Sequence, residues 1–133
     1  MANDSLMVGV ACVFDWAQSF DVIEHVNGPV YMVAEMRRVA RRILLVTPNS
    51  LHLPSILMSV ARRSGRYEPH GDHVVIWSKA EMEGMFSRVG FRKFLVSFTD
   101  FHVHRAHWYI RLLMRFVPFP ALRYRALMVV AEA

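Results

Sequence analysis

The chain has 133 residues, a length that fits one compact domain and not two. Its 54% hydrophobic content excludes general disorder, and its single cysteine, Cys12, excludes an internal disulfide. The longest apolar run, from Leu6 to Phe14, is far shorter than the roughly 20 residues of a membrane-spanning helix. No positively charged segment precedes that run, so no signal peptide is predicted and the expected compartment is the reducing cytoplasm.

The charge balance is basic, with 16 basic against 11 acidic residues and a formal net charge of +5. Most of the basic residues are arginines, scattered along the chain as pairs and single residues. This spacing favours a solvated basic surface over a nucleic-acid interface, where the basic residues cluster. A membrane surface is the other partner that the charge allows.

The first half of the chain predicts strands on either side of one helix. Two short extended segments, Leu6–Phe14 and Asp15–Phe20, come first. Asn27-Gly28-Pro29 then predicts a helix start, because proline favours the first helical turn, and the apolar stripe runs to about Arg41. The continuous β-favouring run Ile43–Thr47 follows and predicts a strand buried on both faces.

The second half begins with a short predicted helix over 55–64. Ser78 and Glu81 then have the spacing of a capping box, which opens a helix that ends at Gly90. The remaining predicted elements are a strand over 91–98, a helix over 104–117 and a strand over 126–131. Alternating strands and helices indicate an α/β fold, with the last two strands antiparallel at an edge of the sheet.

Several short motifs follow one another along the chain: Phe14-Asp15, the run from Phe20 to Val26, Glu35 to Val39, Thr47-Pro48-Asn49, Trp77-Ser78 with Met82, and Val89-Gly90-Phe91. Their order and spacing resemble the C-terminal part of class I S-adenosylmethionine-dependent methyltransferases, from about residue 14 to 133. The resemblance implies one domain over 1–133, a partial Rossmann-like sheet with flanking helices, and S-adenosylmethionine as cofactor. It also implies methyl transfer to an oxygen, nitrogen or carbon of a small-molecule or lipid-like acceptor.

The family's main cofactor-binding motif is missing from this sequence. Class I methyltransferases hold the cofactor with a glycine-rich turn after their first strand and an acidic residue after their second. Only Asp4 and Gly9 precede the matching region. We therefore expect a truncated or impaired methyltransferase; the alternative is a non-catalytic interaction module that docks through an open sheet edge or through the helix from Trp108 to Val117.

The resemblance places Phe20 and Asp21 beside the cofactor and makes His25 the candidate base for the acceptor. If the segment is helical, Asp21, Glu24 and His25 share one face at the end of a strand, where His73 could join them to hold Mg²⁺. This set is similar to that of small-RNA 2′-O-methyltransferases and, without the later histidine, to that of ubiquinone-pathway O-methyltransferases. Alternatively, Glu24 and His25 cap or orient the following helix.

Two further positions are predicted on the substrate side. Asn49 ends a buried strand and faces the same crevice, unless it is simply a turn residue after Pro48. The segment from Trp108 to Val117 is apolar, aromatic and basic. We interpret it as a lid with Trp108 partly buried over the crevice; the alternative is a membrane-surface helix with an outward apolar face.

Overall fold

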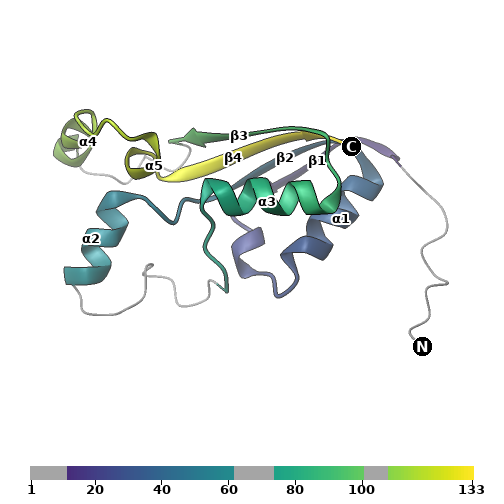
Figure 1. The fold of residues 1–133 in the computed structure, drawn as a ribbon, viewed down its shortest axis with the longest axis horizontal. Helices are drawn as coiled ribbons and strands as arrows, with labels where there is room; N and C mark the ends of the chain where they lie inside the picture. Colours follow the sequence, from purple (N-terminus) through teal and green to yellow (C-terminus); the bar gives the residue numbers. More distant parts are fainter. Residues whose placement is uncertain (1–11, 62–73, 101–107) are drawn as a thin grey trace.

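The computed structural model describes residues 12–61, 74–100 and 108–133, which form a single four-stranded sheet with helices around it (Figure 1). The strands are β1 (Phe14–Phe20), β2 (Ala40–Pro48), β3 (Lys93–Thr99) and β4 (Ala126–Glu132), and their order in the sheet is β1-β2-β4-β3. The predicted α/β class is confirmed. The described part of the N-terminal segment contributes one strand, since residues 1–11 lie outside the description.

The last strand in the chain is an inner strand of the sheet. β1 and β2 are parallel, whereas β4 runs antiparallel to β2 on one side and to β3 on the other. The antiparallel pairing of the last two strands is therefore confirmed; β3 is the edge strand, and β4 lies between β2 and β3. Its composition explains the position, because Ala126, Leu127, Val129 and Ala131 are all buried.

The connection from β1 to β2 contains a single 3-10 turn, η1 (Ile23–His25), and the helix α1 (Pro29–Val39). Pro29 occupies the start of α1, as predicted from its fixed φ. The helix buries Val33 and Met36 against the sheet and passes directly into β2 at Ala40. This parallel crossover brings the ends of β1 and β2 side by side.

The helix α3 (Lys79–Val89) has both predicted termini. At its start, the Ser78 backbone N–H donates to Glu81 Oε2 at 2.7 Å and the Glu81 N–H donates to Ser78 Oγ at 3.3 Å. At its end, Gly90 has φ +94°, and a Cβ there would lie 3.0 Å from Nη1 of Arg37. Glycine is required at this position because a side chain would meet both backbone strain and the packed arginine.

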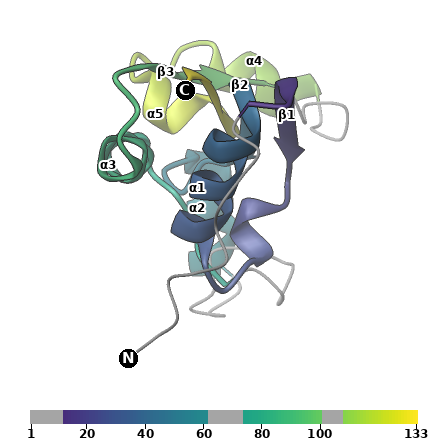
Figure 2. The ribbon, with the colours of Figure 1, turned by 90° about the vertical axis from the view of Figure 1, so that its right-hand side faces the viewer.

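The core lies between the sheet and the pair α1 and α3, which cover the same face (Figures 1 and 2). Phe86 of α3 is fully buried, and its ring centroid lies 5.1 Å from that of Phe91 and 5.9 Å from that of Phe94. Side chains alternate along a strand, so Val96 is buried under α3 whereas Leu95, pointing the other way, is 64% exposed. Within the described segments, α1 and α3 thus cover one face of the sheet.

Three short helices gather at one end of the sheet, on the left in Figure 1. They are α2 (Leu53–Ala61) after β2, α4 (Trp108–Met114) after β3, and α5 (Pro120–Arg123) before β4. The helix α5 was not predicted, and Pro120 occupies its start. In the described part of the chain, no helix has the length and apolar character needed to cross a membrane.

Candidate active site

The ends of β1 and β2 form a polar rim on the sheet, made of Asp21, Glu24, His25 and Thr47. The two strands are parallel and in register, with Phe20 opposite Val46, so both chains leave the sheet at the same level. In open α/β sheets this carboxyl-terminal edge is where ligands bind. The rim is therefore the candidate active site.

Asp21 has a strained backbone at the point where β1 ends. Its φ is +50°, in the left-handed region that few residues other than glycine adopt, although aspartate tolerates it better than most. Its N–H donates to the Val46 carbonyl at 3.0 Å, which extends the pairing with β2 by one residue and holds this conformation in place. Such strain is concentrated at ligand-binding and catalytic positions.

Glu24 places a buried carboxyl in the rim, with 1% of the residue exposed. Thr47 Oγ1 donates to Glu24 Oε2 at 3.2 Å, while Oε1 is buried and has no hydrogen-bond partner among the described residues. Burial raises the pKa of the Glu24 carboxyl and the nearby Asp21 charge adds to this, while hydrogen bonds from the Glu24 backbone and Thr47 oppose it. A buried carboxyl with one unpaired oxygen is suited to exchange or share a proton with a ligand.

The predicted triple of Asp21, Glu24 and His25 does not share a face. The segment is a single 3-10 turn that excludes Asp21, so the i, i+3, i+4 alignment of an α-helix does not arise. Glu24 turns inward and His25 is exposed. No three acidic, histidine or cysteine side chains within the described ranges form a group that could hold a metal ion, and His73 lies outside those ranges.

Asn49 is buried and its side chain is committed to the backbone. Its Nδ2 donates to the carbonyls of Ala121 and Tyr124 at 2.7 and 2.8 Å, and its Oδ1 accepts from the Leu51 N–H at 3.1 Å. These bonds tie the end of β2 to the segment that leads into β4. The geometry does not support the substrate-side role predicted for Asn49, because the amide has the role of a structural clamp.

His52, which the sequence did not single out, lies just beyond the rim. Its Nδ1 is 2.8 Å from Ser55 Oγ, and burial together with the Arg125 charge lowers the pKa of the imidazole to about 4. The imidazole is therefore neutral at physiological pH. The sequence offered little to find it, because both the burial and the arginine, 73 positions away, come from tertiary contacts.

The predicted lid is not observed at Trp108. Its side chain is 76% exposed at the start of α4, with its ring against Tyr109 at a centroid distance of 6.1 Å. Phe20, at the end of β1, is also partly open, with 38% exposure. The expectation that Trp108 is partly buried over the crevice was therefore wrong.

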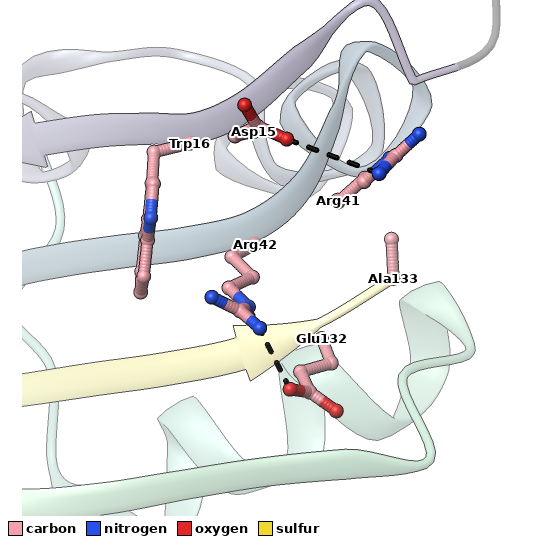
Figure 3. A pocket seen from close by; sticks show the side chains of 6 residues that line it. All are labelled: Asp15, Trp16, Arg41, Arg42, Glu132 and Ala133. Atoms are coloured by element: carbon pink, nitrogen blue, oxygen red, sulfur yellow. Dashed lines mark ion pairs between the residues drawn. The ribbon is translucent and has the colours of Figure 1, made fainter.

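A depression at the opposite end of the sheet is lined by charged residues from three strands (Figure 3). Arg42 lies over the Trp16 ring at 5.5 Å and pairs with Glu132 at 3.7 Å, while Arg41 lies 3.9 Å from Asp15. These pairs are exposed and each contributes little to stability. The depression lies at the amino-terminal ends of β1 and β2, away from the polar rim.

Comparisons with known proteins give matches at the level of structure. No protein-family model matches the sequence, and no curated protein matches it. A SAM-dependent methyltransferase from Archaeoglobus fulgidus aligns over 93% of this chain with a TM-score of 0.61 and 10% identity. The small RNA methyltransferase HEN1 aligns over 92% with a TM-score of 0.57 and 13% identity.

A third match comes from the complex between the Haloferax volcanii Trm112 methyltransferase activator and a methyltransferase, with a TM-score of 0.56, 14% identity and 98% of this chain aligned. At these identities the matches show the fold, which is the class I SAM-dependent methyltransferase fold. The chain spans 62% of the Archaeoglobus protein, 57% of the Haloferax structure's chain and 14% of HEN1. It thus has part of that fold.

Proposed function

We propose that this chain forms the acceptor-facing part of an S-adenosylmethionine-dependent methyltransferase that acts on an oxygen, nitrogen or carbon of a small molecule. The observation that carries the proposal is the polar rim, where a strained Asp21 and a buried, half-paired Glu24 meet at the carboxyl ends of two parallel strands. The fold of the matched structures supports the cofactor class. The bound cofactor would supply an electrophilic methyl group.

The described residues offer only part of a cofactor site. Close approach of a backbone to the cofactor requires glycine. The described glycines instead precede α1 (Gly28), lie within α3 (Gly84) or end α3 (Gly90), and none of them is at the polar rim. In this proposal Phe20 and Asp21 contact the cofactor, and a further segment with a glycine-rich turn provides the remaining contacts.

Acid–base work at the rim is assigned to two residues. His25 is exposed beside the rim and is the base that takes a proton from the acceptor. Glu24, whose pKa is raised by burial, lies one residue before it and positions it, because the hydrogen bond from Thr47 holds the turn that carries both residues. His52 is a poorer base, because its pKa of about 4 leaves the imidazole little affinity for a proton at neutral pH.

Calorimetry tests the cofactor part of the proposal. Titration of S-adenosylmethionine into this chain alone is expected to give little or no heat, and adding a glycine-rich methyltransferase half in trans or in tandem is expected to restore binding. In the restored protein, Asp21→Ala should weaken cofactor binding, whereas Asp21→Asn keeps the left-handed preference and tests the charge alone. Low-micromolar binding of S-adenosylmethionine to this chain by itself would contradict the proposal that a further segment provides most of the cofactor contacts.

A non-catalytic docking role is the second candidate, favoured by the open edge of β1. In the described sheet β1 pairs with β2 alone, and Val13, Phe14 and Trp16 are 56%, 58% and 43% exposed along it. An unprotected apolar edge is a template for another strand. Partnering of a related fold is illustrated by the methyltransferase found with Trm112. Restored methyl transfer in the tandem protein, lost in His25→Ala, would exclude this candidate.

A further inference from the structure

The end of the molecule formed by α2, α4 and the turn after α4, here called the apolar end, exposes large apolar side chains. In α4 and the turn, Trp108, Leu113 and Phe116 are 76%, 67% and 79% exposed. In α2, Leu57 and Val60 are 59% and 71% exposed. Both helices lie at the same end of the sheet, on the left in Figure 1, with α4 level with the sheet and α2 below it; Figure 2 shows the same difference in height.

The apolar side chains of α4 lie on one side of the helix. Trp108 and Leu112 are four residues apart, and Phe116 follows four residues later in the turn that continues the helix, so the three project in a similar direction. Phe119, 63% exposed, extends the group beyond the helix. Exposed aromatic and aliphatic residues in this arrangement are typical of a helix that lies in a membrane interface.

The helices that form the apolar end carry positive charge only. Residues 108–131 contain four arginines and no acidic residue, and residues 49–61 contain no arginine, lysine or acidic residue. Arg115 is exposed at the end of α4, next to Phe116. The acidic residues at this end of the sheet lie outside these helices: Asp100 follows β3, and Asp21 and Glu24 belong to the polar rim. Apolar surface with cations and no acids complements a negatively charged lipid surface.

We propose that the apolar end docks on the surface of an anionic lipid bilayer, with α4 lying in the interface and its apolar side facing the acyl chains. Arg115 contacts lipid headgroups, and α2 provides a second apolar contact. This docking is independent of methyl transfer. It places the polar rim, at the same end of the sheet, close to the bilayer.

Co-sedimentation with vesicles tests the proposal. The chain should bind vesicles that contain phosphatidylglycerol, should bind pure phosphatidylcholine more weakly, and should lose affinity as salt is raised. Phe116→Gln should weaken binding roughly tenfold. The matched control is Tyr31→Gln on α1, an aromatic of similar exposure at 80%, which should leave binding unchanged.

The contribution of Arg115 and the insertion of α4 into the bilayer surface are tested by separate experiments. Arg115→Gln should reduce binding about fivefold at low salt, while Arg92→Gln, which removes an exposed arginine at the other end of β3, should not. Anionic vesicles should blue-shift the tryptophan emission of the parent chain, and Trp108→Phe should remove that shift. Trp16 and Trp77 remain in both proteins as internal controls.

Two outcomes would overturn the proposal. Equal vesicle binding by Phe116→Gln and Tyr31→Gln would show that the apolar end is not the contact. The parent chain could also fail to bind vesicles and instead form a dimer that Phe116→Gln converts to a monomer. That result would show that the apolar end binds a second copy of the chain. Because Phe116 is 79% exposed, its substitution is not expected to unfold the protein, and thermal melting checks this.

Discussion

The face of the sheet under α1 and α3 and the apolar end use the same kinds of side chain in opposite ways. Phe86 in α3 is fully buried against Phe91 and Phe94, whereas Phe116 beyond α4 is 79% exposed. The helix α1 buries Val33 and Met36, whereas α2 buries none of its residues. The high apolar content of the chain is therefore only partly used to build its own core. The rest is available to a partner surface.

The largest difference between the two regions is expected from substitutions of one phenylalanine in each. Phe86→Ala should lower the free energy of unfolding by about 3–5 kcal/mol, because it leaves a cavity in the packed core. Phe116→Ala should change it by less than about 0.5 kcal/mol, because the ring makes few contacts. Chemical denaturation followed by circular dichroism measures both. A large loss in Phe116→Ala would mean that the apolar end is packed in solution.

The clamp at Asn49 ties the end of β2 to the segment that leads into β4. Asn49→Ala removes two buried hydrogen bonds to the carbonyls of Ala121 and Tyr124 and should destabilise the fold by about 2 kcal/mol. Asn27→Ala, at an exposed position before α1, is the control and should be nearly neutral. Thermal melting separates the two variants. Equal melting temperatures for the two variants would contradict the structural role of Asn49.

The pH dependence near the apolar end is expected to come from His52. Its folded pKa of about 4 lies below the ordinary value of 6.5, so the unfolded chain binds more protons between these values. Stability should therefore fall as pH decreases from about 6.5 to 4, by no more than about 2 kcal/mol after allowance for partial exposure. Denaturation of the parent and His52→Gln across this range measures the difference, which should vanish above pH 7.

The smallest effect is expected at Glu24, where hydrogen bonds oppose the cost of burial. Its raised pKa means that the folded state favours the protonated carboxyl, so the contribution of Glu24 to stability is greatest below pH 4.5 and declines as pH rises through the folded pKa. Glu24→Gln should lack this decline and become more stable relative to the parent as pH rises. Melting curves on either side of pH 4.5 test the sign, and an opposite slope would mean that the folded state favours the carboxylate.

Local patterns predicted the best-defined elements of the fold. The capping box at Ser78 and the glycine at 90 act within their own helix, and the run of Ile43–Thr47 needs only burial to become a strand. Prediction was weaker where contacts with distant residues determine the ends of an element. The first residues of the predicted helix over 104–117 lie outside the described ranges, its described part ends at Met114, and α5 follows, where Asn49 binds the carbonyls of Ala121 and Tyr124.

The sequence by itself determined the α/β class, the resemblance to the methyltransferase fold and the positions of Asp21, Glu24 and His25 after the first described strand. Only the tertiary structure decided that β4 lies inside the sheet, that Glu24 turns inward to Thr47, and that Trp108 faces solvent. The physical reason is the distance along the sequence between the residues that interact. Helix caps and apolar runs depend on neighbours within a few residues, whereas burial, strand order and the direction of a side chain depend on partners that only folding brings together.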